Sequence, residues 1–406
     1  MIKTLSTAAV LSVLLLSARV SAQSGAARGD PDVSRARVRV GRLYLNPTIA
    51  LTNLGWDTNV FNEPDQSVPK RDFTLTVTPQ SDLWLKMGHS WVTGNVKEDL
   101  VWYKQYASER SANNSARVGI TLPLNRLRFG AAAAYLRTRD RPGFEIDARS
   151  QRTELAYQGS VDVRARPKTF VGIRGERKTT AFDSVALFEG VSLRDALNRT
   201  VTSGAVTLRQ QLTPLTALTF DVGRGQDRFE FSPLRDSDST SVSAGVAFDA
   251  IIKGTASFGY RDFEPLSPSL PAYKGTIASA DLAYVAYGTT RVGVQATRDV
   301  QYSFEINQPY YLLTGVSGSL TRRVARPVDL VGRIGAQRLN YRDRIGAALA
   351  SLGRIDSVRT YGGGVGFHTG KSVRIGFNVD YARRASPVLY REYQGLLIGT
   401  SVTYGL

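Results

Sequence analysis

The stretch Ser372–Arg383 reads S-V-R-I-G-F-N-V-D-Y-A-R, and apolar and polar residues alternate along it. The apolar residues share one face of an extended chain, and they are Val373, Ile375, Phe377, Val379 and Tyr381. The other face holds Arg374, Gly376, Asn378 and Asp380. Strands of membrane-spanning barrels alternate in this way because one face meets lipid and the other meets water. The stretch therefore predicts a β-strand between hydrocarbon and solvent.

The same alternation recurs from Leu43 to the end of the chain, in segments of about ten to fifteen residues separated by turn residues. In Arg152–Arg166 the polar face carries Glu154 and Asp162 well inside the segment. A soluble β-sandwich would also bury one face, but it would not need such long strands throughout. We therefore predict strands near residues 43–54, 72–87, 91–106, 115–123, 127–140, 152–166, 169–183, 200–212, 217–232, 238–250, 254–265, 273–287, 290–304, 310–324, 329–343, 357–369, 372–385 and 391–406.

Short and long connections alternate between these segments. The tight turns include residues 88–90, 124–126, 166–168, 286–289 and 370–371. Outer-membrane barrels place short turns in the periplasm and long loops outside the cell. The pattern predicts an all-β fold, a transmembrane antiparallel up-and-down β-barrel of about 18 strands with both termini periplasmic.

The start of the chain is typical of a secreted protein. The positive Lys3, the short apolar run Ala8–Leu16 and the small residues that follow predict a signal peptide over residues 1–22. Residues 23–42 are polar and lack periodicity, so we expect a flexible periplasmic lead-in before a barrel of residues 43–406. No later run of about twenty apolar residues could hold the chain in the inner membrane. We expect it in the outer membrane of a Gram-negative cell.

The composition argues against several classes of function. Without cysteine, the fold uses neither disulfides nor a thiolate metal site. The formal charge of +17, or +15 once Lys3 and Arg19 are removed with the leader, suggests an anionic partner. Nucleic acid is not expected, because the basic residues are spread along the whole chain and the protein is secreted.

Catalysis is not expected either. The two histidines, His89 and His368, both lie at tight turns, where they cannot assemble a serine–histidine pair or a three-ligand zinc site. Asp236 and Asp238 offer oxygen ligands for calcium, but no full loop motif follows them. We expect no enzyme, no cofactor and no metal site.

Two long connections contain helical signals. Ser192-Leu193-Arg194-Asp195 resembles a capping box that opens a helix over Leu193–Asn198, and Ala347–Leu352 with Gly353 resembles a helical turn with a glycine stop. Each could be a small helix on an external loop, which is the interpretation we favour. The alternative is a lid or constriction folded into the lumen.

The basic residues form two groups by predicted height and face. The first group lies toward the outer ends of strands, where guanidinium groups would bind lipopolysaccharide phosphates. Its members are Arg137, Arg139, Arg141, Arg177, Lys178, Arg338, Arg342, Arg344, Arg383 and Arg384. The second group lies deeper on the water face, where it would concentrate anions, and it consists of Arg117, Arg164, Arg174, Arg209, Arg291 and Arg374. Acidic residues such as Glu176 and Asp380 are interspersed, so we expect a mildly basic lumen.

One stretch resembles a known family. Residues Pro47–Phe61, P-T-I-A-L-T-N-L-G-W-D-T-N-V-F, resemble the D-x-N-V-F opening of the putative β-barrel porin 2 family. Asp72–Pro79 and Asp82 are similar to that family's second strand. The resemblance implies a large porin-like barrel, and members of the family are found alongside exopolysaccharide synthesis and export machinery. It implies no catalytic residues.

Two functions remain open on this basis. The first is a passive conduit with a mildly basic lumen that assists exopolysaccharide export, with anionic polysaccharide and a periplasmic export component as partners. The second is a structural or assembly anchor that binds lipopolysaccharide or a periplasmic partner without an open pore. We expect no separate plug domain, because the lead-in before Leu43 is only about twenty residues long, and we expect the lumen to be open unless inward loops fill it. Outer-membrane lipid is a partner in both cases.

Overall fold

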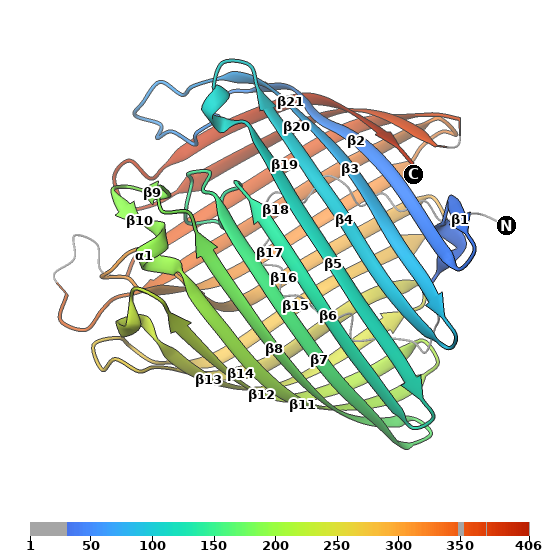
Figure 1. Ribbon diagram of the computed structural model, residues 1–406. Helices are drawn as coiled ribbons and strands as arrows, with labels where there is room; N and C mark the ends of the chain where they lie inside the picture. Colours follow the sequence, from blue (N-terminus) through green and yellow to red (C-terminus); the bar gives the residue numbers. More distant parts are fainter. Residues whose placement is uncertain (1–30, 348–352, 371, 406) are drawn as a thin grey trace.

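The chain forms a closed β-barrel (Figure 1). The computed structural model describes residues 31–347, 353–370 and 372–405. Neighbouring strands of the ring are antiparallel and follow chain order, from β2 (Leu43–Asp57) to β21 (Tyr393–Tyr404). The ring closes where β2 pairs with β21, with Ile49 opposite Tyr404. The predicted up-and-down barrel of eighteen strands is confirmed.

The strand bounds follow the predicted segments closely. The largest difference is at β5, which starts at Ser111 rather than near residue 115. The other strands of the ring are β3 (Asp72–Met87), β4 (Ser90–Tyr103), β5 (Ser111–Leu124), β6 (Leu127–Thr138), β7 (Arg152–Arg166), β8 (Thr169–Phe182), β11 (Arg199–Thr213), β12 (Thr216–Phe229), β13 (Ser237–Asp249), β14 (Ile252–Pro265), β15 (Tyr273–Ala286), β16 (Thr290–Tyr302), β17 (Tyr310–Arg323), β18 (Val328–Arg342), β19 (Ile355–Thr369) and β20 (Val373–Ala385).

Side chains alternate between the outer and the inner wall, because successive residues of a strand point to opposite faces. On β20, Ile375 and Phe377 are about half exposed, whereas the neighbouring Arg374 is buried. Exposed apolar residues recur at every second position around the ring, and examples are Val96, Val118, Ile173, Phe220, Phe258, Val316, Ile334 and Val365. An apolar outer wall of this kind contacts lipid.

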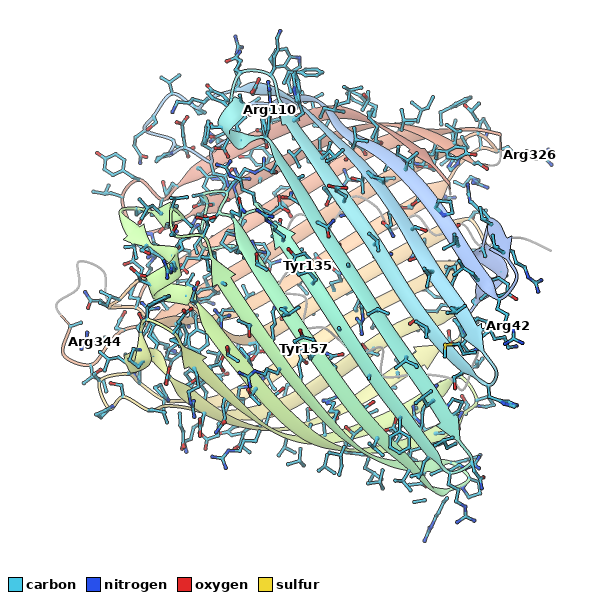
Figure 2. All side chains as sticks on the ribbon, in the orientation of Figure 1. Arg42, Arg110, Tyr135, Tyr157, Arg326 and Arg344 are labelled. Carbon is cyan, nitrogen blue, oxygen red and sulfur yellow. The ribbon has the colours of Figure 1, made fainter. Side chains whose placement is uncertain are left out.

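The barrel has one end of short turns and one end of long loops. The two-residue turn after β3 needs Gly88, whose φ of 63° lies in the left-handed region that hairpin turns of this length require. Because the number of strands is even, both ends of the chain lie on the short-turn side (Figure 1). Figure 2 shows Arg42 and Arg326 at this end and Arg110 and Arg344 near the long loops.

Part of the predicted lead-in forms two short elements of secondary structure. A single 3-10 turn, η1 (Val33–Arg35), precedes β1 (Val38–Val40). Strand β1 pairs with Leu43–Leu45, the section of β2 that β21 does not reach, and so covers an otherwise open strand edge. The predicted signal peptide lies outside the described residues.

The long loops contain short elements. A small hairpin of β9 (Leu187–Phe188) and β10 (Val191–Ser192) leads into α1 (Leu193–Leu197), while η2 (Ala107–Glu109) and η3 (Pro233–Arg235) are single turns. Helix α1 confirms the predicted helix, and the Ser192 hydroxyl caps it by accepting a hydrogen bond from the Asp195 amide at 3.2 Å. The second predicted turn, at Ala347–Leu352, lies outside the described residues except for Ala347. In the described part of the chain, no helix is both long and apolar enough to cross a membrane.

Candidate functional site

The loop of residues 139–151, which connects β6 to β7, crosses the lumen at the long-loop end. Its Phe144 belongs to a buried apolar cluster whose other members come from β17, β18 and β19, and they are Tyr311, Leu339, Tyr341 and Val358. These strands lie about halfway round the ring from β6 and β7. The contact therefore spans the barrel and narrows its mouth.

A second apolar cluster holds the same loop against helix α1. Ile146 packs with Leu193 and Leu197 of α1, with Phe182 and with Phe304 from the loop between β16 and β17. Leu193 has no exposed surface. The favoured interpretation of this helix as an external decoration is therefore wrong, because α1 packs into the mouth of the barrel as part of the constriction.

Two arginines hold the backbone of this loop, Arg384 of β20 and Arg391 of the loop between β20 and β21. The Arg384 Nη1 donates to the carbonyl oxygens of Phe144 at 3.1 Å and Glu145 at 3.0 Å. The Arg391 Nη2 donates to the same Glu145 carbonyl at 2.5 Å. Arg384 also forms ion pairs with Asp147 of the loop at 2.9 Å and with Asp356 of the wall at 2.5 Å. We call Glu145, Asp147, Arg384 and Arg391 the latch.

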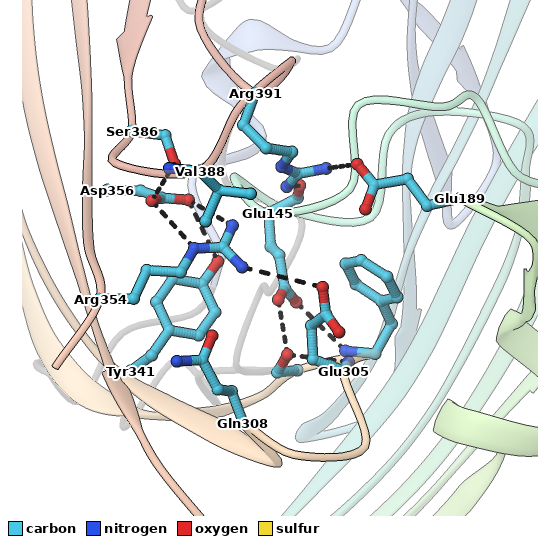
Figure 3. Close-up of polar contacts among 12 residues, drawn as sticks. Glu145, Glu189, Glu305, Gln308, Tyr341, Arg354, Asp356, Ser386, Val388 and Arg391 are labelled. Carbon is cyan, nitrogen blue, oxygen red and sulfur yellow. Dashed lines mark hydrogen bonds and ion pairs between the residues drawn. The ribbon is translucent and has the colours of Figure 1, made fainter. Parts of the chain in front are cut away.

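The carboxyl group of Glu145 is buried in this constriction (Figure 3). It accepts hydrogen bonds from the Ser303 hydroxyl at 2.6 Å and the Phe304 amide at 3.3 Å. Burial raises the pKa of Glu145 to about 7, because the charged form is disfavoured away from water. The Ser303 hydrogen bond and the nearby arginines oppose this increase in pKa.

The barrel wall next to the latch contains a network in which buried arginines are paired with a buried carboxylate (Figure 3). Arg354 pairs with Asp356 at 2.7 Å and lies over the ring of Tyr341, 4.2 Å from its centre. The Ser386 hydroxyl donates to the same Asp356 carboxylate at 2.7 Å. Because the fully buried Asp356 also binds Arg384, removing one of these arginines would leave a buried carboxylate without a full complement of charge.

The sequence analysis did not identify Glu145 or Arg391. A signal was present, since residues 143–147 read G-F-E-I-D and place Phe144 and Ile146 in a connection that otherwise reads as a polar loop. Apolar residues in a loop indicate packing against something, but the partner strands lie more than a hundred residues away. The contact was therefore not visible in local sequence.

All six predicted lumen arginines occupy inner-wall positions of their strands, but they do not form one cluster. Arg174 pairs with Asp221 at 3.1 Å. Arg374 is buried and pairs with Asp329 at 2.6 Å, so its charge is already matched. Within the described ranges, Arg117 and Arg291 have no acidic partner. Of the remaining two, Arg164 donates to a turn carbonyl and Arg209 lies over the ring of Phe170.

Glycines of β19 allow ion pairs to bridge that strand on the inner wall. Arg333 of β18 pairs with Asp380 of β20 at 2.8 Å, and Gly362 lies between them in the register. A Cβ at Gly362 would come within 2.1 Å of the Asp380 carboxylate. Gly362 is thus the close-approach site for this ion pair, which fits the position of this glycine within a strand.

The predicted outer group divides between the two walls. The outer wall carries four exposed members of this group, Arg137, Arg177, Arg338 and Arg383. Arg342 is half-buried and lies on the same face of β18 as Arg338. Lys178 instead pairs with Glu154 on the inner wall at 2.6 Å, and Arg384 is fully buried in the latch. Arg141 binds backbone carbonyls of Asp147 and Val60, and Arg139 binds Ser108 and Glu109. Lys178 and Arg384 were expected at headgroup phosphates, but their side chains point to the inner side of the barrel, where carboxylates of the protein bind them.

Several solved structures have a similar arrangement at low identity. The outer membrane protein OpdK of Pseudomonas aeruginosa is 9% identical with a TM-score of 0.47, and the alignment covers 89% of this chain and 98% of that chain. The FrpB iron transporter of Neisseria meningitidis is 8% identical with a TM-score of 0.42, covering 84% and 62%. A bacterial polysaccharide outer membrane secretin is 12% identical with a TM-score of 0.32, covering 91% and 100%. No protein with a curated description matches the chain.

The family model described as Putative beta-barrel porin 2 matches residues 30–405, which is most of the chain. The resemblance seen at Pro47–Phe61 is thereby confirmed. This match and the closed ring of strands place the protein in the outer membrane, in contact with lipid, and among porins rather than enzymes. The chain belongs to the Putative beta-barrel porin 2 family.

Proposed function

We propose that the barrel is a passive conduit whose mouth at the long-loop end is controlled by the loop of residues 139–151. The observation that carries this proposal is the latch, in which Arg384 and Arg391 hold Glu145 across the lumen. In this proposal the loop has two arrangements, fastened as described and released, and an order-to-disorder transition of a segment is a known form of such a switch. Both termini are periplasmic in this proposal, and the long loops face outside the cell.

The charge of the inner wall supports an anionic cargo. Most inner-wall cations are matched by carboxylates, as in Arg174 with Asp221, and contribute little net field. In the described residues Arg117 and Arg291 have no acidic partner, and inner-wall carboxylates such as Asp162 and Glu176 have no basic one, so the basic excess that would concentrate anions in the lumen is mild. The family resemblance suggests exopolysaccharide as the cargo, delivered by a periplasmic export component at the short-turn end.

Ion selectivity in planar bilayers tests this proposal. With a potassium chloride gradient across the membrane, the reversal potential of the wild-type barrel should indicate a preference for chloride. The Arg117→Gln/Arg291→Gln variant should lose most of that preference, whereas Arg326→Gln, on an exposed short turn, should retain it. A preference for potassium, or a selectivity that the double variant does not change, would reject the basic conduit.

The alternative function is an anchor without an open pore. The burial of the latch favours it, because a mouth packed by Phe144 and Ile146 could be closed permanently. Conductance separates the two functions. A barrel that never conducts, including after release of the latch, would be an anchor.

A further inference from the structure

Four arginines on the outer wall of β16–β20 lie close to one another near the long-loop end. They are Arg298 of β16, Arg338 of β18, Arg359 of β19 and Arg383 of β20. Each lies an even number of residues from exposed apolar residues of its strand, such as Val294, Ile334 and Phe377, and therefore on the same face. Their side chains therefore extend from the lipid-facing wall.

The strand register brings these cations together. Arg359 lies directly opposite Arg383 across the β19–β20 pair. Arg338 lies directly opposite Thr314. The Arg298 Nη1 donates to the Thr314 hydroxyl at 2.8 Å, and its Nε donates to the Thr276 hydroxyl at 3.2 Å. Like charges directly opposite each other destabilise an antiparallel pair. The arrangement thus needs an anion to be favourable.

Among the described residues, the strands supply no such anion on this wall. The outer-facing positions of β16–β21 contain no aspartate or glutamate, because Asp299, Asp329, Asp356 and Asp380 all lie at inner-wall positions and pair there. Elsewhere on the outer wall, several cations have a carboxylate partner. Arg224 and Arg228 of β12 both pair with Asp238, and Lys274 of β15 pairs with Asp262.

The surface next to the four arginines suits a lipid. Two residues further into the wall, Tyr361 and Tyr381 stack with ring centres 6.5 Å apart. Beyond them lie the half-exposed Val365 and Phe377. An aromatic band between charged and apolar zones marks the level where headgroups meet acyl chains.

We propose that Arg298, Arg338, Arg359 and Arg383 bind the phosphates of a lipid whose headgroup carries more than one phosphate group. Guanidinium groups bind phosphate through two parallel hydrogen bonds, and several of them side by side match several phosphates. The site itself does not depend on the proposed orientation of the barrel. Only the choice of leaflet rests on that proposal, which places the site in the outer leaflet. The sequence analysis placed Arg338 and Arg383 in this role but did not single out Arg298 or Arg359.

Native mass spectrometry of the delipidated barrel in detergent tests the proposal. The probes are lipid A with two phosphates, lipid A with one phosphate, and phosphatidylethanolamine. We expect the wild type to retain the two-phosphate lipid best. The Arg359→Gln/Arg383→Gln variant should bind it roughly tenfold more weakly or worse, because charge-assisted hydrogen bonds are lost. The Arg359→Lys/Arg383→Lys variant should be intermediate, since lysine keeps the charge but not the paired geometry.

The matched control is Arg224→Gln/Arg228→Gln, which removes two outer-wall arginines that already have a carboxylate partner. Its affinity should remain close to that of the wild type. Equal affinity in the Arg359→Gln/Arg383→Gln variant and the wild type, or no preference for the two-phosphate lipid over phosphatidylethanolamine, would overturn the proposal. Conductance in phosphatidylcholine bilayers is independent of this assay, so failure of the conduit and failure of the lipid site are distinguishable.

Discussion

Arg383 and Arg384 are neighbours in sequence and have opposite environments. Arg383 is exposed on the outer wall, whereas Arg384 has no exposed surface and binds the loop of residues 139–151 from inside the barrel. The cause is the two-residue period of a β-strand, which sends adjacent side chains to opposite faces. The strand is predictable from the sequence, but the height of the two arginines along it does not separate them, and only their opposite faces reveal the latch.

Glu145 makes the latch sensitive to pH. Its pKa is raised to about 7 in the latched state, from 4.5 in water, so the latched loop binds more protons than the released loop between these values. The latch is therefore most stable below pH 4.5 and weakens as the pH rises through about 7. Because one pKa unit corresponds to about 1.4 kcal/mol, the change is on the order of a few kcal/mol.

We expect the fraction of time in a high-conductance state to increase between about pH 5.5 and about pH 8, a range that brackets the pKa of Glu145. The charged groups that face Glu145 are Arg384, Arg391, Arg354 and Arg235, with Asp147 and Asp356 beyond them. Glu145→Gln keeps an acceptor for Ser303 and removes the titrating proton. A Gln variant with the same pH response as the wild type would show that another group is responsible.

At the scale of elements, the strands were predictable and the loops were not. Each strand carries its own evidence, since the alternation of Val373 to Tyr381 is complete within nine residues. The capping residue Ser192 likewise predicted α1 from a few residues. The loop of residues 139–151 differs because its conformation depends on Phe304 and Leu339, which are distant in sequence. Local sequence indicates that such a loop is unusual but not what it contacts.

The two ends of the barrel give a test of orientation. The chain has no cysteine, so single cysteines introduced at loop tips are unambiguous probes. Val68 is 90% exposed in a long loop, and Tyr287 is 97% exposed in a short turn. A membrane-impermeant maleimide applied to intact cells should label Val68→Cys and leave Tyr287→Cys unlabelled until the cells are lysed. The reverse labelling pattern would show that the barrel is inserted in the opposite orientation, with the latch in the periplasm.

At the scale of the whole molecule, the closed ring follows from a sum of local patterns. The alternation within each strand, the even number of strands and the short turns on one side together predict the architecture, and the family match agrees with it. The state of the lumen depends instead on how loops from opposite sides of the ring meet. Two apolar clusters and one buried charge network narrow the mouth, and none of them is contained in a single segment.

The most direct test of the account is the single-channel conductance of a barrel whose latch has been removed. In Arg384→Met/Arg391→Met the loop loses the donors to Phe144 and Glu145, and Asp356 loses a buried partner, which costs about 3–5 kcal/mol in similar cases. The account predicts a clearly higher conductance than in the wild type, with Arg383→Met, on the outer wall, unchanged and all variants retaining the folded mobility of a barrel on electrophoresis. A folded double variant with the conductance of the wild type would contradict the claim that this loop controls the mouth.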